Sequence, residues 1–290
     1  MSTGNHFLEN TWYVAAWSHE IAADGMLART ITRVPLRFKW VWVWMGDADK
    51  ADPSQIPDTH TLDDAGWRGT PGYLHYAANY LLITDNLLDF SHLSFVHETT
   101  LGGSAKYARI RPKVKRNGRS VRVERWLIDD EPAPFLRNLK TWPGNVDRWN
   151  VYAVVIPGVL LMDSGSAPTG TGAPQGARVD AAQFFGCQAV TPETETTSHY
   201  FFQQSHGFAL DDPSVTENLT QSVLAGFQED KDIILAQQRI LDLAPDAPML
   251  AMRMDTALAS FRDIMEKAIA EERAAPADTN TQGEKNAELS

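Results

Sequence analysis

Cysteine is almost absent from this chain, because Cys187 is the only one among 290 residues. A single cysteine excludes a disulfide bond within the chain. It also excludes an iron–sulfur cluster held by this chain alone, because such clusters need two or more cysteine thiolates. No Cys-His-Asn pattern indicates a nucleophilic thiol. We therefore expect Cys187 to be a small buried apolar residue.

Positive charge is also scarce, with 26 lysines and arginines against 37 aspartates and glutamates and a formal net charge of -11. Nucleic acids and acidic membranes require a basic surface, so neither is an expected partner. The longest apolar run, residues 151–162, is too short to span a bilayer and contains Pro157 and Gly158. The N-terminus lacks the segments of a signal peptide, so we expect a cytoplasmic protein. The glycines form no phosphate-binding loop or dinucleotide fingerprint, which predicts that NADH binds a separate protein.

Residues 85–97, with the sequence DNLLDFSHLSFVH, combine apolar bulk with polar groups that are costly to bury alone. No glycine or proline interrupts them, so we expect a helix with Asn86, Asp89 and His92 on roughly one face. Two imidazoles beside a carboxylate readily bind a divalent metal. His97 follows His92 by five positions, so a bend, a wide turn or the helix end must bring both rings to one ion. Two core histidines bonded to the backbone are the alternative.

A second long helix is expected over residues 213–243, with Asp211 or Asp212 as its N-cap and a proline in its first turn. Asp230 falls within its apolar stripe, whereas Glu229 and Asp232 are interpreted as solvated surface charges. A carboxylate in a core-facing stripe must be ion-paired or bound to a metal. Two histidines and a carboxylate are the ligands of non-haem Fe(II) oxygenases, although zinc hydrolases use similar ligands.

These segments resemble the large (alpha) subunits of Rieske-type non-haem iron aromatic ring-hydroxylating oxygenases. The similarity is greatest to the branch of vanillate O-demethylase, dicamba demethylase and toluenesulfonate methyl-monooxygenase, and extends from residue 12 to about 272. It is carried by residues 85–97 together with the segments NY (79–80), MDSGSAP (162–168), TPET (191–194) and FQED (227–230). The resemblance implies that His92, His97 and Asp230 hold a mononuclear Fe(II). It also implies that Asp89 bridges the iron to an electron source on a neighbouring subunit and that Asn86 lies close to the metal.

The resemblance implies an α+β fold: a helix-grip (START-like) catalytic domain with an antiparallel sheet and long C-terminal helices, preceded by a remnant of a β-rich Rieske domain. The expected divisions are a truncated Rieske-domain remnant and linker (1–58), a mononuclear iron catalytic domain (59–275) and a disordered tail (276–290). The implied reaction is oxidation by O2 of a methyl or methoxy group on a small aromatic acid. The implied partners are a separate NADH-dependent flavin/iron–sulfur reductase and further copies of the chain in a homotrimer.

One segment of the family pattern is missing. Two strand-like runs meet directly at Phe38 and Lys39, where family members carry the ligands of the [2Fe-2S] Rieske cluster. A Rieske cluster requires two cysteines and two histidines, so this chain cannot hold one. We therefore expect the chain to bind iron and substrate without turning over alone. Natural shortening, an error in the gene sequence and deliberate removal all remain open. The remaining strands have lost neighbours, which predicts exposed tryptophans and unpaired edges near residues 34–45.

The remaining pattern favours one antiparallel sheet. Its strands are expected at 107–115, 120–128, 148–156, 159–162, 179–190 and 196–204, with an Asn-Gly hairpin turn at Asn117. A strand at 75–80 leads into the first metal-bearing helix, and a last helix is expected at about 255–272. The N-terminal remnant is expected to hold strands at 11–17, 27–33, 34–38 and 39–45. Two other functions stay open. One is a non-catalytic ligand-binding module on the same fold, and the other is a zinc hydrolase.

Overall fold

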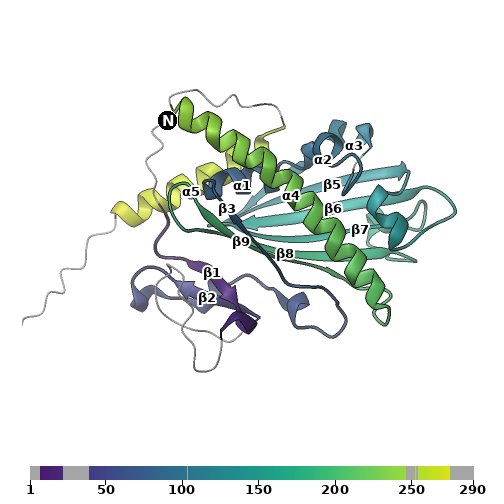
Figure 1. Cartoon of the computed structure of the whole chain (residues 1–290), viewed down its shortest axis with the longest axis horizontal. Helices are drawn as coiled ribbons and strands as arrows, with labels where there is room; N and C mark the ends of the chain where they lie inside the picture. Colours follow the sequence, from purple (N-terminus) through teal and green to yellow (C-terminus); the bar gives the residue numbers. More distant parts are fainter. Residues whose placement is uncertain (1–6, 22–38, 103, 246–251, 253, 275–290) are drawn as a thin grey trace, which may run out of the picture.

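An antiparallel sheet of seven strands, in the order β3-β9-β8-β7-β6-β5-β4, carries most of the chain (Figure 1). The computed structural model describes residues 7–21, 39–102, 104–245, 252 and 254–274. The strands expected at 27–33 and 34–38 and the tail expected at 276–290 lie outside these residues. The strands are β1 (Trp12–Trp17), β2 (Trp40–Trp44), β3 (Gly72–Tyr76), β4 (Lys113–Asn117), β5 (Ser120–Asp130), β6 (Val146–Val155), β7 (Val159–Pro168), β8 (Ala182–Pro192) and β9 (Ser198–His206).

Short and long helices complete the fold. The α-helices are α1 (Tyr80–Leu88), α2 (Leu93–Val96), α3 (Ala105–Arg109), α4 (Pro213–Leu243) and α5 (Thr256–Ala274), and the 3-10 helices are η1 (Ser18–Glu20), η2 (Ala48–Lys50), η3 (Pro53–Gln55), η4 (His60–Leu62), η5 (Phe90–His92), η6 (Pro134–Asn138) and η7 (Ala173–Gln175). No helix in the described part of the chain is both long and apolar enough to cross a membrane.

The long helix α4 crosses one face of the sheet (Figure 1). Asp212 accepts a hydrogen bond from the main-chain N–H of Ser214 and Pro213 occupies the first turn, as the sequence predicts. Phe227 is buried on the sheet side of α4, and its ring centroid lies 4.8 Å from that of Phe202 in β9. Burying a large apolar side chain of this kind contributes about 1.5–3 kcal/mol. Together these contacts fix where each residue of α4 stands over the sheet.

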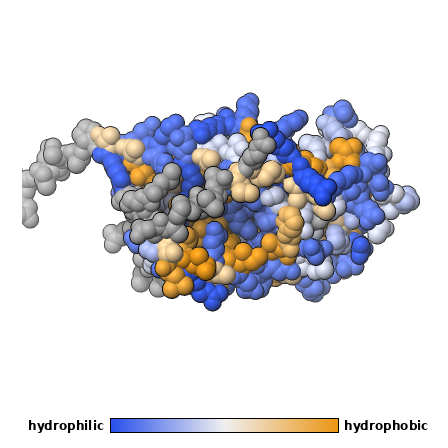
Figure 2. Space-filling model, turned by 90° about the horizontal axis from the view of Figure 1, so that it is seen from above, coloured by the Kyte–Doolittle hydropathy of each residue, from blue (hydrophilic) through white to orange (hydrophobic). Residues whose placement is uncertain are grey.

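The side of α4 that faces away from the sheet exposes several large apolar side chains to solvent. Its exposed large apolar side chains are Leu224, Ile233, Ile240 and Leu243. The face of the molecule seen from above is mostly hydrophilic but contains a contiguous hydrophobic band (Figure 2). Exposed apolar side chains that gather on one face are characteristic of a contact surface.

The antiparallel sheet and the C-terminal helices confirm the expected α+β fold. The hairpin predicted at Asn117 is also present: β4 ends there, and Gly118 takes the positive φ of 54° that the turn requires. The strand predicted over 107–115 is wrong in its first half, because residues 105–109 form α3. The Tyr107 ring is fully buried and its hydroxyl donates to Asn150 of β6 over 2.8 Å, so this segment covers the sheet instead of extending it.

A separate two-stranded sheet, β1 with β2, holds the tryptophans that we expected to be exposed. That expectation is wrong, because Trp40, Trp42 and Trp44 are buried. They belong to one apolar cluster with Cys187 and Phe201, which come from β8 and β9 of the main sheet. The apolar surface of the main sheet therefore covers them. Among the described residues β1 and β2 pair only with each other, and Cys187 is fully buried as expected.

Candidate metal centre

The backbone breaks at Asp89, so residues 85–97 are not the continuous helix that their composition predicts. Helix α1 ends at Leu88, Asp89 adopts φ -108° and ψ 87°, and η5 and α2 follow. The Asp89 carboxylate accepts a hydrogen bond from the main-chain N–H of Ser91 over 2.9 Å and so caps η5. Between the two histidines, η5 ends at His92 and α2 ends at Val96, so His97 lies at the helix end, one of the arrangements that the five-residue spacing allows.

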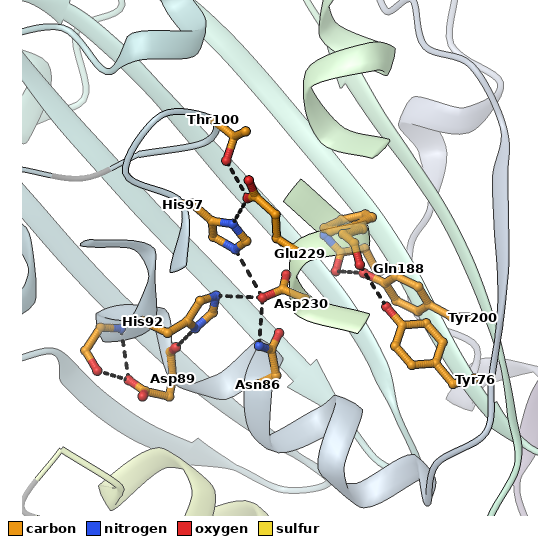
Figure 3. Close-up of polar contacts among 12 residues, drawn as sticks. Tyr76, Asn86, Asp89, His92, His97, Thr100, Gln188, Tyr200, Glu229 and Asp230 are labelled. Atoms are coloured by element: carbon orange, nitrogen blue, oxygen red, sulfur yellow. Dashed lines mark hydrogen bonds and ion pairs between the residues drawn. The ribbon is translucent and has the colours of Figure 1, made fainter. Parts of the chain in front are cut away.

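Three side chains from two parts of the chain that are distant in sequence come together: His92 in η5, His97 at the end of α2, and Asp230 in α4. His92 Nε2 is 3.4 Å and His97 Nε2 is 3.1 Å from Oδ1 of Asp230, which projects from the middle of α4 (Figure 3). One nitrogen or oxygen from each of the three lies within 4.8 Å of the others, which is close enough for one ion. His97 is fully buried, Asp230 is 5% exposed, and His92 is partly buried.

Each imidazole is oriented by a hydrogen bond from its other ring nitrogen. His92 Nδ1 donates to the main-chain oxygen of Asp89, and His97 Nδ1 donates to Glu229 Oε2 over 2.7 Å. A main-chain oxygen and a carboxylate oxygen accept these bonds, so both Nδ1 atoms carry hydrogen, and in the neutral rings both Nε2 atoms present a lone pair. Thr100 donates to the same Glu229 oxygen over 2.6 Å (Figure 3). Interpreting Glu229 as a solvated surface charge is therefore wrong.

The donor set fits a divalent first-row metal. Two nitrogen lone pairs and a carboxylate oxygen face one another in a buried space, an arrangement that repels itself unless a cation lies between them. His97 Nε2 has no hydrogen-bond partner within the described residues, although it is buried. Asn86 Nδ2 donates to Asp230 Oδ1 over 3.0 Å and holds that carboxylate in place. Sequence reasoning singled out all these residues except Glu229 and Thr100, which carry no spacing signal.

The protonation of the two imidazoles responds to the same surroundings. Burial lowers the pKa of His92, and the charge of Asp230 offsets this only in part. Burial also lowers the pKa of His97, but its close contact with the Asp230 carboxylate and its hydrogen bond to Glu229 outweigh burial, so the net pKa is raised. Neutral His92 is thus available as a ligand.

A cavity of about 90 Å³ adjoins these three side chains. Its lining is mainly apolar, as in most small-molecule sites. The apolar side chains are Leu87, Phe90, Leu93, Leu101, Phe135, Met162, Phe184, Leu219, Val223 and Phe227. The polar side chains other than the metal-facing ones are Asn86, Arg148, Asn150, Ser164, Gln188 and Gln204.

The fold and this centre define a class of non-haem oxygenase, and comparison with known proteins specifies it. Residues 76–271 match the family model of the vanillate O-demethylase oxygenase C-terminal domain. The chain therefore belongs to that family, in the vanillate demethylase and toluenesulfonate monooxygenase branch of Rieske-type oxygenases. Its homologues are oxygenase components of aromatic O-demethylases and of a toluenesulfonate monooxygenase, which are oxidoreductases. A non-catalytic binding module is not favoured.

Individual relatives show how much of the chain is shared. The iron–sulfur subunit of the toluene-4-sulfonate monooxygenase system of Comamonas testosteroni is 35% identical, over 90% of this chain and 96% of the relative. The vanillate O-demethylase oxygenase subunit of Pseudomonas sp. (strain ATCC 19151) is 30% identical, over 83% of this chain and 74% of the relative. A crystal structure of dicamba monooxygenase with non-haem iron and dicamba has a TM-score of 0.63 and 27% identity, covering 81% of this chain and 67% of that one.

The alignment with the toluene-4-sulfonate monooxygenase subunit also shows that this chain is shorter than its relative in an internal region. The alignment has 336 positions, but 90% of this chain's 290 residues is only about 261 residues. About 75 positions of the alignment therefore contain no residue of this chain. Because the alignment reaches 96% of the relative, these positions are internal gaps.

Proposed function

We propose that this chain is an oxygenase component that holds one Fe(II) through His92, His97 and Asp230. It oxidises a methyl or methoxy carbon of a small aromatic acid with O2. The observation that carries the proposal is the convergence of two Nε2 lone pairs on one carboxylate oxygen, at 3.4 Å and 3.1 Å, beside an apolar cavity. Two histidines and one carboxylate leave coordination positions open for dioxygen.

The bound iron supplies the activation of dioxygen, and the chain's own residues orient the groups around it. Asp89 and Glu229 fix the two rings through their Nδ1 atoms, and the Asn86 amide fixes the Asp230 carboxylate. The apolar lining excludes water and holds an aromatic ring beside the metal. The expected catalytic residues remain Asp89 and Asn86, which lie next to the ligands without being ligands themselves.

The electrons must come from outside this chain. With Cys187 as its only cysteine it lacks the ligands of a [2Fe-2S] cluster. Asp89 is partly exposed and its main-chain oxygen accepts from His92 Nδ1, so this residue connects a metal ligand to the surface, where a neighbouring subunit would supply electrons. Phe95, between the two histidines, is 73% exposed, and its exposure supports a subunit contact at this face. We propose a homotrimer supplied by a separate NADH-dependent flavin/iron–sulfur reductase.

Anaerobic reconstitution tests the metal assignment. The chain is expected to bind one Fe(II), measured by metal analysis after desalting, and Asp230→Ala and His97→Ala are expected to bind none. Asp232→Ala, which alters an exposed acid on the same helix, is the matched control. Equal iron in the control and in both ligand variants, or zinc retained in preference to iron after anaerobic purification, would refute the assignment.

A complementation assay tests the electron supply. Iron-loaded chain with reductase, NADH and 4-toluenesulfonate should give no steady product. Addition of an intact homologue whose own iron-ligating histidines are replaced should restore turnover, because that homologue then contributes only its cluster. Asp89→Asn should lose the restored activity while still binding iron. Steady turnover by the chain with reductase alone would show that it needs no second subunit.

A further inference from the structure

The cavity beside the metal centre carries an unpaired positive charge. Arg148 of β6 lines the cavity and is 8% exposed. Its guanidinium donates to two main-chain oxygens, those of Gly102 at 2.6 Å and Leu101 at 3.5 Å. These bonds satisfy part of its donor capacity but do not neutralise its charge. The arginines that form ion pairs in the described residues are Arg116, Arg122, Arg178 and Arg262.

A second buried cation lies against the same tyrosine ring as Arg148. Arg125 of β5 is 3% exposed, and both guanidinium groups lie over the buried Tyr107 ring, with Cζ 4.9 Å from its centroid for Arg125 and 5.1 Å for Arg148. Nε and Nη1 of Arg125 have no hydrogen-bond partner within the described part of the chain. A buried charge without an ion-pair partner is costly, so Arg148, which lines the cavity, favours a bound anion there, and the nearby charge of Arg125 adds to this preference.

Two amides line the same cavity with their acceptor oxygens engaged, and one of them, Asn150, lies two residues after Arg148 on β6. The Tyr107 hydroxyl donates to Asn150 Oδ1 over 2.8 Å, which leaves Asn150 Nδ2 with only the weak acceptor Met162 Sδ at 3.8 Å. In the same way the Tyr200 hydroxyl donates to Gln188 Oε1 over 2.7 Å. Asn150 and Gln188 both line the cavity. Their acceptor oxygens are therefore engaged, and the amino group of Asn150, next to Arg148, has only a weak acceptor.

The cavity accordingly offers donors and positive charge but hardly any negative charge. Asp230 is the one carboxylate among its lining residues, and it faces the two imidazoles. We propose that Arg148, with the amino group of Asn150, binds the acid group of the substrate and so selects aromatic sulfonates and carboxylates over neutral aromatics. This inference rests on the proposed function, because it assigns the substrate to the cavity beside the iron.

Calorimetric titration of the full chain, with and without Fe(II), tests the preference for an anion. The probes are 4-toluenesulfonate, 4-toluate and 4-toluenesulfonamide, which is uncharged at pH 7 and similar in shape to the sulfonate. The wild-type chain should bind at least one of the two acids about tenfold or more tightly than the sulfonamide, because charge-assisted hydrogen bonds are about twice as strong as neutral ones. Which acid binds more tightly identifies the natural acid group. Equal affinity for all three probes would overturn the proposal.

Variants assign the preference to one side chain. Arg148→Gln should weaken acid binding by about 30-fold or more while leaving sulfonamide affinity nearly unchanged. Arg148→Lys, which keeps the charge but lacks the planar fork, should retain a reduced preference for the acids. Arg122→Gln is the control, because Arg122 lies on the same sheet with an exposed side chain. If Arg148→Gln does not fold, Arg148→Lys provides the test by itself. An acid preference equal to that of the wild type would refute the proposal, and so would a complete loss of that preference, because a reduced preference is expected.

The outcomes separate this inference from the proposed function. Selective acid binding by a chain that binds no iron would refute the proposed function and leave the anion site standing. One bound Fe(II) without acid selectivity, or selectivity that survives in Arg148→Gln, would refute the anion site alone.

Discussion

His97 Nδ1 and Glu229 Oε2 are 2.7 Å apart, which joins one imidazole of the metal centre to the residue immediately before Asp230 in α4. Two successive residues of one helix thus contact the two nitrogens of one ring, because His97 Nε2 faces Asp230. A carboxylate on Nδ1 fixes the ring and increases the basicity of Nε2.

Glu229→Ala should lower Fe(II) affinity by about 10–100-fold, the usual cost of losing such a supporting bond. Glu229→Gln should lose less, because its amide oxygen still accepts from His97 Nδ1. The measurement is competition for Fe(II) against a coloured chelator under anaerobic conditions. Asp232→Asn, on the exposed side of the same helix, should match the wild type. Unchanged affinity in Glu229→Ala would show that the bond only packs the helix.

Removing the metal should lower thermal stability, and Asp230→Asn should abolish that dependence. Fe(II) at 100 times its Kd stabilises the folded chain by about 2.7 kcal/mol, since the unfolded chain lacks the site. In Asp230→Asn the amide can donate to an imidazole Nε2, which relieves the repulsion in the metal-free protein. Calorimetry should therefore find its metal-free melting temperature no lower than that of the wild type and unaffected by Fe(II). A normal Fe(II)-dependent rise in this variant would remove Asp230 from the ligand set.

Cys187 should be unreactive in the native protein. Burial raises the pKa of its thiol to about 12, although a contact with Thr61 lowers it slightly. At pH 8 almost no thiolate exists, and the side chain is fully buried. Iodoacetamide should label no thiol in the folded chain and one per chain in urea, as counted by mass spectrometry. Rapid native labelling would mean that the contact between β8 and the β1-β2 sheet opens readily.

Arg262→Met should destabilise the contact between α5 and α1, where Arg262 bonds both carboxylate oxygens of Asp85. The expected loss is about 2 kcal/mol at pH 7, below the range for a fully buried pair because the Arg262 side chain is 31% exposed. Urea unfolding measures it, and Arg239→Met, exposed on α4, is the control.

The same pair makes a prediction about pH. Burial raises the pKa of Asp85 even though Arg262 lowers it in part. An acid whose pKa is raised on folding makes stability fall as pH rises through the interval between its unfolded and folded values. Without Arg262 that interval widens, so the cost of Arg262→Met should be smaller at pH 5 than at pH 7. An equal cost at both pH values would show that Asp85 has the same ionisation state in the variant as in the wild type, so that loss of Arg262 does not widen the interval.

The residues that sequence reasoning placed correctly are those whose position depends on a regular period. Asp230 was identified because it lies within the apolar stripe of a long helix, so its side chain must point to the core. Asn117 was identified because an Asn-Gly pair is a local signal for a hairpin turn. Glu229 was missed for the same reason, since one residue along a helix turns the side chain about 100° from the stripe. Its partner His97 comes from a loop whose path no local pattern specifies.

The other failures are tertiary in origin. Nothing local predicts the break at Asp89, because the carboxylate cap on Ser91 competes with continued helix and packing decides between them. The tryptophans of β2 were expected to be exposed because the strands that would normally pair with them near residues 34–45 are missing. The structure buries them against β8 and β9, which no pattern within residues 34–45 reveals.

Because the helix is interrupted at Asp89, the three ligands lie on segments that differ in how easily they unfold locally. His92 and His97 lie in or beside segments of three and four residues, whereas Asp230 stands inside a helix of 31. Short segments open with little free energy, while the middle of a long packed helix opens only with the whole fold. The ion would then be released and bound again through local opening of the segment that carries the two histidines. Asp230 would keep its position in α4 throughout.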